Sequence, residues 1–175
     1  MPVYRTTRLE EAVNRGRLIV PAWVGLHTRI ALQGFCGPDG RHEGMVFWIG
    51  RRLAPDVIVV AVAIPDCDHG QQHVQASPQA VGNVARTART YRLGIVAQVH
   101  SHPGNDTRHS TGDDSMILMP FEGMFSVVVA SYGDAGMTQT SGVGLHQYQD
   151  GRWVRIGPKC DGALTIVPSL IGRID

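Results

Sequence analysis

The stretch VHSHPGNDTRHSTGDD, residues 99–114, joins the end of an apolar segment to closely spaced histidine, serine and aspartate residues. The segment IVAQVHSHP, residues 95–103, predicts a strand. His100 and His102 lie two residues apart on it, so both imidazoles project from the same face of the strand. A metal site needs this convergence, because two ring nitrogens must each lie within ~2.1 Å of a single zinc ion.

Ser110 and Asp113 lie at the start of a segment, STGDDSMILM, that is predicted to be helical. An aspartate in the first turn of a helix can direct its carboxylate toward the end of the strand. Asp113 would then join His100 and His102 as a third ligand and leave one tetrahedral position for water, the arrangement of catalytic zinc. The same spacing also fits a helix capping box, in which the serine bonds first-turn amides. The two roles are compatible, because a capped helix would present Asp113 rigidly.

Strands and helices are mixed along the chain, without an internal repeat, a low-complexity tract or a linker. Apolar runs rich in β-branched and aromatic residues predict strands, whereas helical periodicity after a proline or serine predicts helices. This mixture indicates the α/β (α+β) class, as an α/β or α+β sandwich. The predicted strands are 17–20, 44–52, 56–66, 95–103, 124–132 and a hairpin over 143–157, and the predicted helices are 7–16, 21–35, 77–93 and one from 110.

A chain of 175 residues, with 43% hydrophobic and 18% charged residues, suits one soluble domain with an apolar core. Its formal net charge of +1 gives no bulk attraction to nucleic acid or to a membrane surface, so we expect neither as a partner. The longest apolar run, VIVVAVAIP, is well short of the roughly 20 residues of a membrane-spanning helix. Three widely spaced cysteines, and an N-terminus without the apolar core of a secretory signal, fit a reducing cytoplasm.

A hydrolytic metal site also needs a group that takes a proton from water and passes it to the leaving amine. Of the glutamates, Glu10 and Glu11 lie in the N-terminal segment, and Glu122 follows the Asp113 helix. Glu43 stands directly before the apolar strand GMVFWIG. Taken alone, a glutamate at the start of a strand is more often a solvated surface residue.

Glu43, the apolar strand after it and HSHPGNDTRHSTGDD together resemble the JAMM motif of the JAB/MPN domain family of metalloproteases. The family pattern is a glutamate followed by H-x-H-x7-S-x2-D, and every position of it is filled. The order of the predicted elements also fits. The resemblance implies an MPN/JAB (cytidine-deaminase-like) fold over residues 17–157, with a mixed β-sheet flanked by helices. Residues 1–16 would be an N-terminal extension and residues 158–175 a C-terminal tail.

The resemblance also implies a role for each residue of the motif. His100, His102 and Asp113 would bind one zinc ion per chain. Glu43 would be the general acid/base that holds the catalytic water, and Ser110 would donate a hydrogen bond to the oxyanion. Iron and manganese stay open as alternatives, although two imidazoles and a carboxylate suit zinc well.

HSHPG with HSTGDD is most similar to the bacterial JAB proteins found with ubiquitin-like conjugation systems. This implies a cytoplasmic isopeptidase or peptidase that cuts after the C-terminal residue of a ubiquitin-like protein, the expected partner. The alternatives are a zinc peptidase that processes a sulfur-carrier protein or a small amino-acid conjugate, and a non-catalytic MPN scaffold. A homodimer is compatible with the sequence.

Residues 66–74, DCDHGQQHV, offer a second set of metal-binding residue types, namely Cys67, Asp68, His69 and His73. The surrounding glycine and glutamine residues instead favour a flexible loop, which in the family can cover the C-terminal tail of the substrate. The segment is short, which argues against a large insertion that grips the substrate. His109 could be a further metal or substrate contact, but we favour an ordinary loop histidine. The spacing leaves Asp114 facing elsewhere on the helix.

Overall fold

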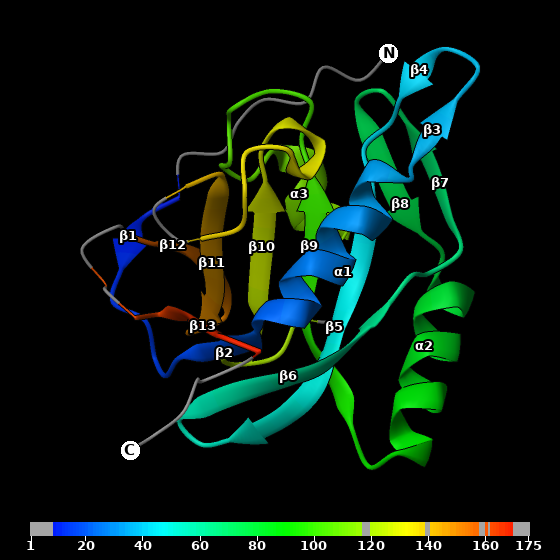
Figure 1. The fold of residues 1–175 in the computed structure, drawn as a ribbon. Helices are drawn as coiled ribbons and strands as arrows, with labels where there is room; N and C mark the ends of the chain where they lie inside the picture. The colour runs from blue at the N-terminus through cyan, green and yellow to red at the C-terminus, as the bar shows by residue number, and fades with distance from the viewer. Residues whose placement is uncertain (1–8, 117–119, 139–140, 158–159, 161, 170–175) are drawn as a thin grey trace, which may run out of the picture.

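The computed structural model describes residues 9–116, 120–138, 141–157, 160 and 162–169 (Figure 1). Its main element is a nine-stranded mixed sheet with the strand order β1-β12-β11-β10-β9-β5-β6-β2-β13. Two hairpins, β3–β4 and β7–β8, form separate two-stranded sheets. The strands are β1 (Glu11–Ala12), β2 (Leu18–Pro21), β3 (Cys36–Gly37), β4 (Gly40–Arg41), β5 (Met45–Leu53), β6 (Asp56–Ala63), β7 (Cys67–Gly70), β8 (His73–Ala76), β9 (Gly94–Ser101), β10 (Phe125–Val129), β11 (Val143–Gln149), β12 (Arg152–Ile156) and β13 (Leu164–Val167).

Two longer helices, α1 (Ala22–Gln33) and α2 (Pro78–Thr90), pack against opposite faces of the sheet around β5. Successive side chains of a strand point to opposite faces. Trp48 of β5 therefore lies in the same apolar cluster as Leu32 of α1. Its neighbour Phe47 lies in a second cluster with Ala80 and Ala88 of α2. A short helix, α3 (Thr111–Met116), and a 3-10 turn, η1 (Ser131–Gly133), complete the helical elements of the described residues.

The observed elements confirm the mixed α+β class. The helices predicted over 21–35 and 77–93 correspond to α1 and α2, and the predicted hairpin over 143–157 corresponds to β11 and β12. The turn of that hairpin consists of Asp150 and Gly151, whose φ angles of 52° and 79° match the two-residue turn that suits twisted antiparallel strands.

The helix predicted over residues 7–16 is wrong for the part of that segment that the structure describes. Glu11 and Ala12 form β1, which runs parallel to β12. The backbone N–H of Arg155 donates to the carbonyl of Glu10 at 2.9 Å. The open edge of β12 thus supplies main-chain partners, whereas a short isolated helix is marginal in water.

Both ends of the described chain contribute strands to the main sheet. β1 lies within the expected N-terminal extension, and β13, from the expected tail, pairs in parallel with β2. The domain boundaries at residues 16 and 157 stay a prediction. None of the described helices combines the length and the apolar character that a membrane crossing requires.

The antiparallel pairing of β5 with β9 determines where the candidate site forms. Met45 pairs with His100, and the backbone N–H of Ser101 donates to the carbonyl of Gly44 at 3.0 Å. The chain before Met45 and the chain after His100 therefore run side by side. This register brings Glu43 next to His102 at one end of the central strands.

Candidate metal centre

Three side chains predicted as metal ligands converge at the end of β9. The Nε2 atoms of His100 and His102 lie 3.2 Å apart, and each faces one carboxylate oxygen of Asp113 at 3.3 Å. Among the described residues, these three form the one group of His, Cys, Asp or Glu side chains that is compact enough to hold a metal ion. All three are largely buried, with His100 0% and Asp113 4% exposed.

The protonation of the two imidazoles suits metal binding. His102 Nδ1 lies 2.8 Å from the carbonyl oxygen of Asp106 and donates to it, so Nε2 carries the lone pair that faces the cluster. Burial lowers the pKa of His100, which keeps that ring neutral. Burial also acts to lower the pKa of His102, but the hydrogen bond that the protonated ring donates from Nε2 to Asp113 and the charge of that carboxylate raise it overall. A proton therefore competes with a metal ion mainly at His102.

Asp113 is held at the start of α3 by a reciprocal cap. The backbone N–H of Ser110 donates to Asp113 Oδ2 at 2.6 Å, and the backbone N–H of Asp113 donates to Ser110 Oγ at 3.2 Å. Burial raises the pKa of Asp113, but the two imidazoles and the Ser110 N–H hold it well below its ordinary value. The capping box is thus present, and it directs the carboxylate toward His100 and His102.

Glu43 lies beside this cluster, with 9% of the residue exposed. Its backbone N–H donates to the carbonyl of Gly70 in the β7–β8 hairpin at 2.8 Å. Burial raises the pKa of Glu43 to about 7; the charge of His102 lowers it and that of Asp113 raises it. Near neutral pH the carboxylate therefore exists in both protonation states, as a group that first accepts and then returns a proton requires.

The donor set fits a divalent metal ion. Atoms that lie ~2.1 Å from a common ion in a tetrahedral arrangement are about 3.4 Å apart, close to the spacing of the two Nε2 atoms and the Asp113 oxygens. Two neutral imidazoles and one carboxylate form three ligands of a kind found in catalytic sites. His100, His102 and Asp113 are the residues that could hold the ion.

The interpretation of His109 as an ordinary loop histidine is wrong. The residue is 0% exposed, and its Nε2 lies 2.9 Å from Ser126 Oγ of β10. Its ring stacks on that of His146 in β11, with the centroids 3.9 Å apart. The sequence shows the histidine but not its burial, because the contacts come from strands that follow it in the chain. The side chain of Asp114 lies outside the described residues.

The segment from 66 to 74 forms a hairpin rather than a flexible loop. β7 and β8 pair through a turn at Gln71 and Gln72, and the four candidate ligands of this segment do not gather into a metal site among the described residues. His69 instead lies with its Nδ1 2.8 Å from Nδ1 of His42, whose Nε2 faces Asp39 at 2.5 Å. This chain of contacts joins the hairpin to the segment that leads into Glu43.

Sequence reasoning missed Tyr132, which follows β10 in η1. Burial and the charge of Glu43 both raise the pKa of its phenol, which places Tyr132 in the electrostatic neighbourhood of the candidate base. The guanidinium of Arg41 lies over the ring, 4.6 Å from its centroid. No motif marks this residue, because its backbone N–H reaches the carbonyl of His102 only through the parallel pairing of β9 with β10.

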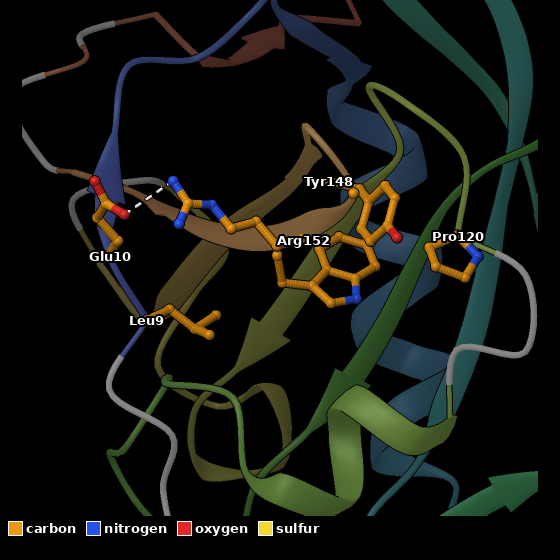
Figure 2. A pocket seen from close by; sticks show the side chains of 7 residues that line it. Leu9, Glu10, Pro120, Tyr148 and Arg152 are labelled. Atoms are coloured by element: carbon orange, nitrogen blue, oxygen red, sulfur yellow. Dashed lines mark ion pairs between the residues drawn. The ribbon is translucent and has the colours of Figure 1, made fainter.

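A surface pocket of about 430 Å³ lies on β11 and β12, away from the three candidate ligands (Figure 2). Tyr148 and Trp153 meet in it edge to face, with ring centroids 5.3 Å apart. Glu10 and Arg152 form an exposed ion pair at its rim at 3.0 Å. The ring of Trp153 also contacts that of His109, at 5.4 Å between centroids, so the pocket and the metal cluster are separated by the buried histidine.

Comparison with known proteins assigns the chain to a family. The family model for prokaryotic homologs of the JAB domain matches residues 39–141, a range that includes Glu43, His100, His102 and Asp113. The chain therefore belongs to the prokaryotic JAB domain family.

A probable metalloprotease of Sinorhizobium fredii is 30% identical over an alignment of 100 residues, and the match covers 52% of this chain and 58% of that protein. The match thus spans less than two thirds of that relative. Two solution structures share the fold. A protein from Desulfitobacterium hafniense has a TM-score of 0.65 at 14% identity, covering 88% of this chain and 95% of that one. A protein from Salinibacter ruber has a TM-score of 0.55 at 15% identity, with coverages of 90% and 95%.

Proposed function

We propose that this chain is a zinc-dependent peptidase or isopeptidase of the JAMM type, with the MPN (cytidine-deaminase-like) fold. The observation that carries the proposal is the convergence of His100, His102 and Asp113 next to a buried glutamate. Two imidazoles, one carboxylate and an open position favour zinc over other divalent ions. Membership of the JAB family and the similarity to a probable metalloprotease support hydrolytic chemistry.

A bound zinc ion and Glu43 would have separate tasks in amide hydrolysis. A bound zinc ion would polarise the scissile carbonyl and make water more acidic. Glu43 accepts a proton from the attacking water as the carbon–oxygen bond forms, and it donates that proton to the amine nitrogen as the carbon–nitrogen bond breaks. Its pKa of about 7 suits both transfers near neutral pH. The products are a carboxylate and a free amine.

Ser110 would stabilise the oxyanion that develops on the carbonyl. Its Oγ accepts a hydrogen bond from the Asp113 backbone N–H, which orients the oxygen at the edge of the cluster. The hydroxyl proton can then be donated to the substrate. Loss of one such donor typically costs about 10²-fold or more in turnover.

The proposed substrate is the C-terminal tail of a ubiquitin-like protein, cut after its last residue from a lysine side chain or from a peptide extension. Such tails bind in extended form by adding a strand to a sheet edge. β7 belongs to a two-stranded sheet in which β8 is its partner, and Gly70 at its end accepts from the backbone of Glu43. A tail paired along the outer edge of β7 would thus be led toward Glu43.

The test combines metal analysis with a substrate panel. Ubiquitin-like and sulfur-carrier proteins, each extended at the C-terminus by a reporter through a peptide or isopeptide bond, are incubated with the zinc-loaded protein and analysed by intact mass. We expect cleavage after the last residue of a ubiquitin-like protein. Glu43→Gln should retain zinc and lose about 10²- to 10⁴-fold in turnover.

Two variants separate the roles at Ser110. Ser110→Ala should lower turnover by about 10²-fold, whereas Ser110→Thr keeps a hydroxyl and should retain most of it. Cleavage of sulfur-carrier proteins alone would favour that alternative substrate. Full activity of Glu43→Gln would exclude Glu43 as the base. A protein that binds neither zinc nor iron nor manganese after reconstitution would be a scaffold rather than an enzyme.

A further inference from the structure

The chain between His102 and α3 leaves the sheet and returns to it at one buried side chain. Residues 103–106 and 108 are exposed, whereas His109 is fully buried. The next residue is Ser110, which caps α3 together with Asp113. The buried His109 therefore directly precedes the cap.

The His109 ring is held by side chains from several strands of the sheet. Its Nε2 lies 2.9 Å from Ser126 Oγ of β10. One face of the ring stacks on His146 of β11, with an angle of 30° between the planes. Trp153 of β12 meets the ring edge at 65°, and the His100 ring of β9 lies 6.4 Å away between centroids. His109 is thus in contact with both the core of the sheet and a candidate metal ligand.

Residues of β10 and β11 fit the path of this loop across the sheet. Ser126 and His146 are directly opposite each other in the antiparallel pairing of β10 with β11, so both side chains lie on the face that His109 covers. Gly144 of β11 has no side chain at the point where the loop crosses, and a Cβ there would lie 1.9 Å from the carbonyl oxygen of Thr107. Gly144 therefore leaves room for the loop, and the Ser126 hydroxyl lies within hydrogen-bond distance of the His109 ring.

We propose that His109 is a positioning residue of the metal centre. Held by Ser126 and His146, it places Ser110 and Asp113 so that the carboxylate meets His100 and His102 at metal-binding distance. The proposal rests on the metal centre of the proposed function. His109 acts through the capping residues and does not take part in proton transfer or substrate binding.

A histidine that merely fills the core would behave differently. Its replacement would lower the stability of the folded protein, but the folded molecules would bind metal with unchanged affinity. A positioning residue changes the affinity itself and the geometry of the bound ion. Outer partners of metal ligands typically contribute about 10- to 100-fold to metal affinity.

The experiment measures the zinc dissociation constant by competition with a chromophoric chelator, and the coordination geometry from the visible absorption of the cobalt(II) form. His109→Phe keeps a stacked ring and loses the hydrogen bond, and Ser126→Ala removes the partner hydroxyl. We expect each to weaken zinc binding by about tenfold. Because both remove the same interaction, the double variant should bind no more weakly than either single variant. His109→Gln, with an amide that can reach Ser126 Oγ, should bind zinc more tightly than His109→Phe.

Thr28→Val is the matched control, because it too removes a hydroxyl from a buried hydrogen bond. Thr28 Oγ1 accepts from Trp48 Nε1 at 2.7 Å, on the face covered by α1. It should leave the zinc affinity and the cobalt spectrum unchanged. Wild-type affinity and spectra in both His109→Phe and Ser126→Ala would overturn the proposal, as would an equal loss in Thr28→Val. If the wild-type protein itself binds no zinc, the proposed metal centre fails with it, so the wild-type measurement distinguishes the two failures.

Discussion

Replacing Glu43 by glutamine should change how the stability of the metal-free protein depends on pH. Burial raises the pKa of Glu43 from 4.5 to about 7, with a lowering contribution from His102 and a raising one from Asp113. A tenfold change in proton affinity corresponds to about 1.4 kcal/mol, so the ionised carboxylate is about 3 kcal/mol less stable in the folded protein than in the unfolded chain. Because the folded pKa is the higher one, this cost is absent below pH 4.5, grows as the pH rises and is complete above about 7.

The assay is urea unfolding of the wild-type protein and Glu43→Gln in the presence of a chelator, at several pH values from about 4 to about 8. Glutamine is similar in size and carries no charge. The variant should therefore gain about 3 kcal/mol relative to the wild type over this range. Glu10→Gln, which removes a carboxylate whose side chain is 66% exposed, controls for the loss of a surface charge. A difference between wild type and Glu43→Gln that does not change with pH would refute the idea that Glu43 is held in a poorly solvated site.

Two further substitutions test the packing on either face of the sheet. Thr28→Val should lower the free energy of unfolding by about 1–3 kcal/mol, because it leaves the buried indole N–H of Trp48 without its acceptor; urea unfolding with unchanged stability would contradict this. Gly144→Ala places a methyl group against the carbonyl of Thr107, so it should cost about 1–3 kcal/mol and weaken zinc binding by displacing the loop. A variant that unfolds and binds zinc like the wild type would show that the loop does not depend on this close approach.

The local arrangement of the candidate metal ligands was predictable because it depends on short stretches of chain. His100 and His102 face the same way because side chains of a strand repeat every two residues. Ser110 and Asp113 cap a helix through backbone groups only three residues apart. Buried strands and helices were likewise visible from their hydrophobic periodicity, as in β5, β9 and α1.

Other features depend on which strands pair, and no short stretch contains that information. β1 formed in place of the predicted helix because the edge of β12 was open to it. His109 looks like any polar loop residue until Ser126, His146 and Trp153 are brought around it. The hairpin from 67 to 76 and the approach of Tyr132 to Glu43 likewise depend on neighbours from distant parts of the chain.

The sequence by itself determined the residue types of the centre, the convergence of the two imidazoles and the cap that presents Asp113, since strand periodicity and helix capping act within a few residues. Only the tertiary structure decided that Glu43 is buried beside His102 and that a histidine stack supports the loop between the ligands. The antiparallel register of β5 with β9 joins Met45 to His100, two residues that lie far apart in the chain. Burial and proton affinity at the site follow from that register, because they depend on everything that surrounds a side chain and not on its neighbours in the chain.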